Sequence, residues 1–322
     1  MKRNIILSLV ALFLCTSFVK ADDDLYQRVV LLEEFTTEKC ANCPSRTQLV
    51  NEIMDSVAYQ GKIVAVYHHS GFYSDFLTLP ADEDYKWFYN YKSTYAPALM
   101  FDRYPYFETK GRPGSGQRKP TPVSDINNRH NITKYLDRRL ADKPHVGFYL
   151  TGQYDNDKTI TVRMSGVRDS MFCNTDPRVT VYVVENHVEA ENQAGAQGVF
   201  FHNHVMRAYN SVWGDVLTWN GDTFEYECQL PVEPEWNKDY IQVVAFVHSY
   251  DSEDPGNCAV ENTRVIDFQT ILGIEDAQTH KEVKDIQYFT LDGVHTTPLT
   301  DGIYVQKTTY SDGSVETQKI IK

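Results

Sequence analysis

Apolar residues in the first part of the chain form short continuous runs that alternate with stretches of helical spacing. The continuous runs at residues 29–32, 63–67 and 99–101 are typical of strands that are covered on both faces. Residues 46–57 carry apolar side chains three and four positions apart, which predicts a helix, and residues 81–92 predict a second, polar-aromatic helix. The order strand, helix, strand, helix, strand predicts an α/β sheet that contains parallel strands.

The hydrophobic period changes to two after residue 143. One more helix is expected at residues 125–140, and beyond the boundary apolar side chains such as Val146 and Phe148 occupy every second position. Turn residues separate the runs that follow. The pattern predicts that residues 144–272 form an all-β domain, built as a sandwich.

Residues 273–322 predict a small third unit. Three short strands are expected, at residues 286–291, 303–309 and 315–321, and Asp-Gly dipeptides typical of hairpin turns lie near their ends. This segment has few large apolar side chains, so its core is marginal.

The first 21 residues have the pattern of an export signal. Lys2 and Arg3 precede an apolar run at residues 5–15, and a cleavage pattern ends at Ala21. The run is shorter than the ~20 residues that a membrane-spanning helix needs. Cys15 follows a large residue, which argues against lipidation. We therefore expect an exported mature chain that starts at Asp22 and resides at the outer membrane, at the cell surface or in the medium, with the periplasm as the alternative.

The chain is acidic, with 31 Lys and Arg against 44 Asp and Glu and a formal net charge of −13. Nucleic acids and anionic lipids bind basic faces, so this balance argues against a nucleic acid as the main partner. Hydrophobic residues make up 42% of the chain, which is enough to build packed cores and excludes wholesale disorder.

Five cysteines remain once the signal is removed. Cys40 and Cys43 form a C-x-x-C motif, and the other three, Cys173, Cys228 and Cys258, lie far downstream. Disulfides persist in exported proteins. Because five is odd, at least one thiol is free, buried or paired between molecules. The sequence leaves the pairing of the last three open.

The C-x-x-C motif lies in the segment EEFTTEKCANCP, between a buried strand and a helix. This context places Cys40 at the helix N-terminus, where unpaired amides and the helix dipole favour a thiolate, and Lys39 adds positive charge. Cys43 lies one turn further, within reach to close a disulfide. Three interpretations stay open: a redox-active pair, a fixed structural disulfide, and a metal site with His68 and His69 as extra ligands.

This arrangement resembles the thioredoxin fold. The resemblance implies that Glu34, six residues before Cys40, is a buried carboxylate that moves protons for Cys43. It also implies that Pro97, in the segment YAPA, is the cis-proline that faces the disulfide. Cys40 would attack a partner and Cys43 would resolve the mixed disulfide. The sequence departs from the family in having Lys39 in place of Trp, and Ala-Asn in place of Gly-Pro between the cysteines.

More narrowly, the chain is similar to the outer-membrane-protein-28 family of type IX-secreting bacteria. The similarity is carried by LLEEFTTEKCANCP, by APALMFDR at residues 96–103 and by HNHVMRAY at residues 202–209, which SVWG follows. It spans residues 29–268. Members are thioredoxin-like proteins with an appended β-domain, so the resemblance implies a location at the outer membrane more than a defined activity.

The last residues, 273–322, resemble a type IX secretion C-terminal sorting domain. The features that carry this resemblance are YFTLDG, DGIYV, SDGSV and the closing KIIK. Such domains direct passage across the outer membrane and are often removed afterwards. The resemblance implies the type IX secretion machinery as a partner, and a plain β-module is the alternative.

Two further groups have residue types that bind metals. His202 and His204 form an H-x-H that would point to one face of a strand, but no third ligand is identifiable, so we expect a hydrogen-bonded structural pair. Asp251, Glu253 and Asp254 offer the oxygen ligands that calcium takes, in a spacing that matches no known loop, so a solvated turn is expected. No metal and no cofactor is predicted.

The sequence thus predicts an α/β thioredoxin-like domain at residues 22–143, an all-β sandwich domain at 144–272 and a small C-terminal β sorting domain at 273–322. Two functions fit this prediction. The first is an exported thiol-disulfide oxidoreductase that acts on protein thiols or disulfides, with Cys40, Cys43, Glu34 and Pro97 in its site. The second is a surface binding or adhesion protein that keeps the fold as a scaffold with a structural disulfide.

Overall fold

The structure, a computed structural model, describes residues 25–90, 93–109, 119–155, 158–273, 283–290, 294–296, 302–310 and 315–321. The chain divides into two compact units, Met1–Phe268 and Gln269–Lys322. The predicted signal peptide lies outside the described residues. Within the described part of the chain, no helix combines the length and the apolar character needed to cross a membrane.

Strands dominate the described structure, and helices are few and short. The α-helices are α1 (Cys43–Met54), α2 (Pro80–Asp84), α3 (Arg129–Ala141) and α4 (Phe268–Ile271), and the 3-10 helices are η1 (Tyr85–Tyr89), η2 (Lys238–Tyr240) and η3 (Pro255–Asn257). The strands are β1 (Val30–Thr36), β2 (Ile63–His69), β3 (Ala98–Phe101), β4 (Phe107–Thr109), β5 (Lys119–Thr121), β6 (Val146–Asp155), β7 (Thr159–Arg168), β8 (Pro177–Glu185), β9 (Val188–Ala190), β10 (Phe200–His202), β11 (Val205–Tyr209), β12 (Asp215–Val216), β13 (Thr223–Pro231), β14 (Ile241–Ser249), β15 (Val260–Asp267), β16 (Val283–Thr290), β17 (Ile303–Tyr310) and β18 (Val315–Ile321).

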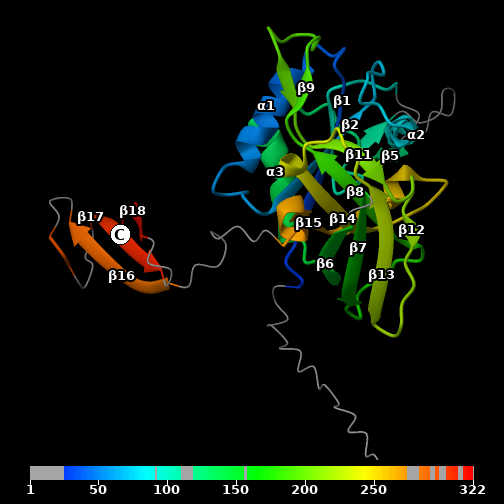
Figure 1. The fold of residues 1–322 in the computed structure, drawn as a ribbon. Coiled ribbons are helices and arrows are strands. Elements are labelled where there is room, and N and C mark those ends of the chain that lie inside the picture. Colours follow the sequence, from blue (N-terminus) through cyan, green and yellow to red (C-terminus); the bar gives the residue numbers. More distant parts are fainter. Residues whose placement is uncertain are drawn as a thin grey trace, which may run out of the picture. The chain divides into compact units, whose positions relative to one another are not determined.

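One large mixed sheet forms the centre of the first unit (Figure 1), in the order β15-β14-β8-β11-β2-β1-β3, with β12 attached to β8. β1 pairs in parallel with β2 and antiparallel with β3, and β11 pairs in parallel with β2. The strands β8, β11, β14 and β15 come from the segment predicted as a separate β-domain. The residues on both sides of the expected boundary at residue 143 therefore belong to one compact unit. The reason is that β11 pairs with the edge of β2 that β1 does not use, and so bonds backbone groups there.

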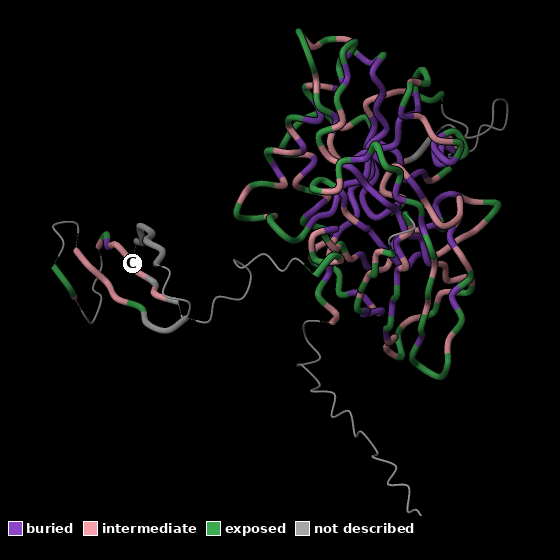
Figure 2. Tube along the Cα trace, in the orientation of Figure 1, coloured by how far each residue is buried: buried purple, intermediate pink, exposed green. Residues whose placement is uncertain are grey.

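β1 is buried over its whole length because each of its faces has its own hydrophobic core. Val30 and Leu32 belong to a cluster that includes the inner faces of α1 and α3. Phe35 belongs to a second cluster with α2 and η1. Figure 2 shows the buried residues along these central strands. Since successive side chains of a strand point to opposite faces, Glu33 and Glu34 enter different cores.

A second sheet has the strand order β13-β7-β6, and one of its two faces is buried. Along β7 the buried residues Ile160, Val162 and Met164 alternate with exposed or half-buried ones. β6 contacts β15 of the large sheet, and Asn262 Nδ2 donates to the Val146 carbonyl across this junction at 3.1 Å. The residues predicted as a sandwich thus supply strands to both sheets.

The predicted helix at residues 81–92 is shorter and partly 3-10 in character. α2 is followed directly by η1, in which Tyr85 and Phe88 are buried. A spacing of three residues brings side chains above one another in a 3-10 helix, so this geometry directs both aromatic rings into the core. Asn90 ends the segment with φ of 46°, a left-handed conformation that Asn tolerates.

The second unit contains a three-stranded antiparallel sheet in the order β16-β17-β18. These strands match the three that the sequence predicts for residues 273–322. Tyr304 on β17 is buried within the unit.

Candidate functional site

The C-x-x-C motif lies in the connection from β1 to α1. Cys40 and Cys43 form a disulfide with their Cα atoms 5.4 Å apart. The Cys40 N–H donates to the Thr37 carbonyl at 3.0 Å, and α1 begins at Cys43. Pro44 occupies the first turn of the helix, where backbone N–H groups have no partner within the helix, so the missing N–H of proline costs no hydrogen bond. Cys40 therefore lies in the turn that leads into the N-terminus of the helix.

Glu34 lies on the α1 face of β1 and is fully buried. Neither of its carboxylate oxygens has a hydrogen-bond partner. Burial raises the pKa of Glu34 to about 8, although the charge of Arg46 opposes this rise. An unpaired buried polar group costs on the order of 1–3 kcal/mol. Packing alone gives no reason for such a residue, since an apolar side chain would fill this position at no such cost.

Arg46 is a site residue that sequence reasoning missed. It lies on α1, three residues after Cys43, and is only 5% exposed. Its Nη1 atom is buried without a hydrogen-bond partner. Burial lowers the pKa of Arg46, and the charge of Glu34 acts in the opposite direction. The available signal was its helical spacing, which turns it toward the buried side of α1.

Pro97 precedes β3, and the peptide bond before it is cis. Pro97 lines a cavity of about 530 Å³ together with Asn42, Arg46 and Tyr95. Asn42 lies between the two cysteines in sequence, so this cavity joins the motif to the Pro97 loop. The structure thus brings three of the predicted elements, the C-x-x-C, the Pro97 loop and the Glu34 face of β1, around the N-terminal part of α1.

Both cysteines are nevertheless covered. Cys40 is 4% exposed and Cys43 is 2% exposed. The loop between β9 and β10, residues 191–199, which we name the strap, contacts the backbone of the motif. Gln193 Nε2 donates to the Cys40 carbonyl at 3.1 Å, and the Ala194 N–H donates to the Glu38 carbonyl at 2.8 Å. Nothing in the local sequence predicts this contact, because Gln193 is 153 positions away from Cys40.

The expected effect of Lys39 on the Cys40 thiolate is weakened in the structure. Lys39 Nζ pairs with Glu38 Oε1 at 3.0 Å, and the Lys39 side chain is half-exposed. The neighbouring carboxylate and solvent both screen this charge, so Lys39 adds little positive potential at the motif.

Asp75 connects the motif to the loop after β2. Its Oδ2 atom accepts the Glu38 N–H at 2.7 Å and is 2.8 Å from His69 Nδ1. Burial would raise the pKa of Asp75, but the hydrogen bond and charge of His69 outweigh it and hold that pKa low. Asp75 therefore ties His69 to the backbone of the motif at Glu38.

His202 and His204 do not share a strand face. His202 ends β10 with its ring 4.8 Å from that of His69, whereas His204 follows β10 with φ of 57° and packs on Tyr67. Burial lowers the pKa of His202 to about 3, and His69 adds to this effect, so the ring is neutral. Among the described residues, no group of three or more His, Cys, Asp or Glu side chains is placed to hold a metal ion.

The three other cysteines are free thiols. Cys173 is exposed, Cys228 is half-buried and Cys258 is buried. Burial raises the pKa of both Cys228 and Cys258 to about 11, so they stay protonated at neutral pH. The sequence left open which of these three described cysteines pair, and in the structure none of them forms a disulfide.

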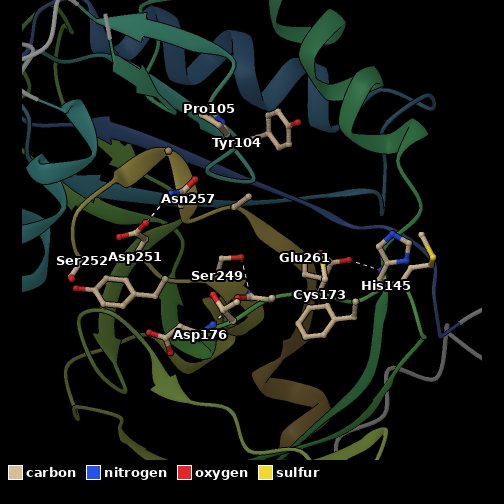
Figure 3. A pocket seen from close by; sticks show the side chains of 17 residues that line it. Tyr104, Pro105, His145, Cys173, Asp176, Ser249, Asp251, Ser252, Asn257 and Glu261 are labelled. Atoms are coloured by element: carbon tan, nitrogen blue, oxygen red, sulfur yellow. Dashed lines mark hydrogen bonds between the residues drawn. The ribbon is translucent and has the colours of Figure 1, made fainter. Parts of the chain in front are cut away.

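A larger cavity, of about 700 Å³, has no motif residue in its lining (Figure 3). Several of its polar groups are hydrogen-bonded within the protein. The His145 N–H donates to Glu261, and Asp251 accepts from the Glu253 N–H at 2.8 Å and from Asn257 Nδ2 at 2.8 Å. The acidic residues considered for calcium therefore organise their own turn.

Comparison with known proteins places the chain. The sequence pattern of the family described as "Outer membrane protein Omp28" matches residues 104–268. HBP35 of Porphyromonas gingivalis has the same fold, with a TM-score of 0.62 and 19% identity over 92% of this chain and 99% of that chain. A domain of the outer membrane lipoprotein Omp28 from Porphyromonas gingivalis matches with a TM-score of 0.25 and 17% identity over 38% of this chain and 87% of that chain, too weakly for any argument. No curated protein matches the chain.

Proposed function

The chain belongs to the Omp28 family of outer membrane proteins, and we propose that in this setting it exchanges disulfides with partner proteins through Cys40 and Cys43. The family match begins at residue 104, so the proposal rests on the site itself. The order β1, α1, β2, with β3 antiparallel to β1, supports a thioredoxin-like arrangement of residues 22–143.

The observation that carries the proposal is the buried, unpartnered carboxyl group of Glu34. Its pKa of about 8 is close to the ordinary pKa of a thiol, about 8.5. Proton transfer between two groups is most effective when their pKa values match. A carboxyl group that titrates close to neutral pH, held on the α1 face of the sheet, therefore suits proton exchange with Cys43.

The exchange takes place in two steps when a partner disulfide is reduced. The Cys40 thiolate attacks one partner sulfur, which forms a mixed disulfide and releases the other partner sulfur as a thiolate. Cys43 then gives its proton to the ionised form of Glu34 and attacks Cys40 Sγ, which closes Cys40–Cys43 and releases the second partner sulfur as a thiolate. The two partner thiolates take up protons from Glu34 and solvent, so the partner leaves as a dithiol. Two electrons pass from the motif to the partner. A partner dithiol reduces Cys40–Cys43 by the reverse steps.

A glutathione equilibrium tests the proposal. The full chain is incubated in glutathione buffers of stepped potential, free thiols are trapped by alkylation, and peptides with Cys40 and Cys43 are quantified by mass spectrometry. Redox-active pairs titrate above about −300 mV, whereas structural disulfides lie below it. A pair that stays oxidised throughout this range contradicts the proposal.

Replacing Glu34 tests its role separately. Glu34→Gln should slow resolution of the mixed disulfide by roughly 100-fold or more, at the lower end of the usual contribution of a positioned proton acceptor. Attack by Cys40 should change by less than about twofold, because the carboxyl group serves Cys43. Both steps can be followed with a disulfide-linked fluorescent peptide, and Cys43→Ala provides the reference in which the mixed disulfide persists.

The alternative function is a surface binding protein in which Cys40–Cys43 only staples the β1–α1 connection. The near-complete burial of both cysteines favours it. The glutathione titration separates the two functions, because a staple does not equilibrate with the glutathione pool.

We also propose that residues 273–322 are a type IX sorting domain that brings the protein to the cell surface. The separate compact unit and its three-stranded sheet support this assignment. Deleting residues 273–322 should leave the protein in the periplasm, as judged by surface labelling of intact cells. Surface exposure of the truncated protein would contradict the sorting role.

A further inference from the structure

We propose that the strap, residues 191–199, is a gate over Cys40 that a partner must displace before thiol-disulfide exchange starts. This inference rests on the proposed exchange function. Its basis is that a motif expected to present Cys40 to partners leaves that residue only 4% exposed. The hairpin of β9 and β10 that carries the strap extends beside the ends of β1 and β2 in Figure 1.

The strap touches the motif at three successive residues. Gln193 donates from Nε2 to the Cys40 carbonyl, and the Ala194 N–H donates to the Glu38 carbonyl. Gly195, with φ of +80°, lies so close to the Ala41 carbonyl that a Cβ atom would overlap it. The strap is therefore fitted to the motif, and only glycine fits at its third contact.

The same contacts indicate that the strap can open. Gln193 is the only buried residue of the strap, and its Oε1 atom has no hydrogen-bond partner. The other strap residues are exposed or half-buried, as Figure 2 shows for the tip of this hairpin. Segments with few buried contacts open locally far more often than a core strand does.

The base of the strap is anchored more firmly. His202, at the end of β10, is buried with its ring against His69, and β10 pairs with β9. Motion is therefore confined to residues 191–199, and the hairpin stays in place.

Opening also defines the class of partner. When the strap leaves, the carbonyl groups of Glu38 and Cys40 lose the donors that Ala194 and Gln193 supply. An extended polypeptide segment around a partner cysteine offers backbone N–H groups to replace them. The gate thus favours an extended protein segment over a compact folded surface.

Two glycines of the strap provide a matched test. Gly195→Ala forces a Cβ atom against Ala41, whereas at Gly198, with nearly the same φ of +77°, an added Cβ atom would have no neighbour within 4 Å. Gly198→Ala therefore imposes the same backbone strain without displacing the strap from the motif. Each full-length protein is reduced with excess phosphine, freed of reductant and pulsed with iodoacetamide, and Cys40 labelling is measured by mass spectrometry.

Cys40 should be labelled at least about 10-fold faster in Gly195→Ala than in the unaltered protein, with Gly198→Ala within about twofold, since only the first substitution opens the site. Equal rates in all three proteins overturn the gate and leave the exchange function intact if their Cys40–Cys43 pairs titrate with glutathione. Pairs that never titrate in any of the three overturn the exchange function, and the gate with it.

Gln193→Ala gives a second route to the same answer. It removes the hydrogen bond to the Cys40 carbonyl without adding bulk, and should speed Cys40 labelling by about threefold or more, as expected for losing one hydrogen bond of the cover. Unchanged labelling in this variant and in Gly195→Ala contradicts the gate, whatever the thermal stability of either protein.

Discussion

Glu33 and Glu34 are adjacent on β1 and both are fully buried, yet their surroundings are opposite. Glu33 accepts hydrogen bonds from Arg103 Nε at 2.8 Å and Arg103 Nη2 at 2.6 Å, and lies 3.0 Å from His68 Nε2. Glu34, on the other face, has no hydrogen-bond partner at either oxygen. The two faces of one strand therefore hold one fully paired carboxylate and one unpaired carboxyl group.

The charge states follow from the partners and not from burial. Burial alone raises the pKa of both residues, but the charge and hydrogen bonds of Arg103, with those of His68, outweigh it and lower the pKa of Glu33 to about 2. Glu34 has only the charge of Arg46 to oppose burial, and its pKa stays near 8. The paired face is suited to holding the fold, and the unpaired face is suited to exchanging a proton.

The largest loss of stability is expected when the buried ion pair between Glu33 and Arg103 is broken. Glu33→Gln leaves the guanidinium of Arg103 buried without its counter-charge, which typically costs 3–5 kcal/mol, so the free energy of unfolding should fall by about that amount. Urea denaturation of the oxidised protein measures it. In the double variant Glu33→Gln/Arg103→Gln the loss should be well below the sum of the two single losses, and additive losses would show that the pair is not coupled.

The unpaired face should make stability depend on pH. Because the native pKa of Glu34 is raised above its unfolded value of 4.5, the folded state holds its proton longer, and stability falls as pH rises from about 4.5 to about 8. Between pH 5 and pH 8 this group should cost roughly 3 kcal/mol, since each pKa unit corresponds to about 1.4 kcal/mol.

The Glu34→Gln variant isolates that contribution. The difference in free energy of unfolding between the variant and the unaltered protein should grow in favour of the variant as pH rises, because Gln never ionises. Urea denaturation at pH 5, 6, 7 and 8 measures the difference. A constant difference across this range would show that Glu34 titrates in the same way in both states.

Arg46 should set where the titration of Glu34 occurs. Its charge lowers the pKa of Glu34, so Arg46→Met should move the midpoint of the pH dependence upward by about one unit, roughly the scale of one partly screened charge. Arg46→Lys, which keeps the charge, is the control and should leave the midpoint nearly in place. A midpoint that does not move in Arg46→Met would remove Arg46 from the electrostatics of the site.

The smallest effect is expected at an exposed ion pair of similar length. Arg129 Nη2 and Glu52 Oε2 are 2.8 Å apart, as close as the Arg103–Glu33 contacts, but both side chains are about half-exposed. Glu52→Gln should cost less than about 1 kcal/mol, because solvent screens such pairs. A loss as large as that of Glu33→Gln would mean that distance, and not burial, decides the contribution.

Several features followed from local patterns in the sequence. The buried runs, the helix after the motif and the family were predicted, and the β-rich mixed sheet, the Cys40–Cys43 disulfide and the family are confirmed. The redox role of Cys40, Cys43, Glu34 and Pro97 stays a prediction. These signals could be read because hydrophobic period and motif spacing depend on residues within one or two turns of each other.

Other features depend on contacts between distant residues, which no local pattern records. Glu33 and Glu34 are neighbours of the same residue type, so the sequence does not distinguish them. Only the fold brings Arg103, 70 positions away, into contact with Glu33. The sequence likewise predicts a Cys40 that attacks partners, whereas in the fold Cys40 is buried and its carbonyl is bonded to Gln193. The sequence by itself determined which residues enter the buried strand and the motif. The tertiary structure decided which of them are paired, charged or covered, because those properties depend on what the opposite face of each element meets.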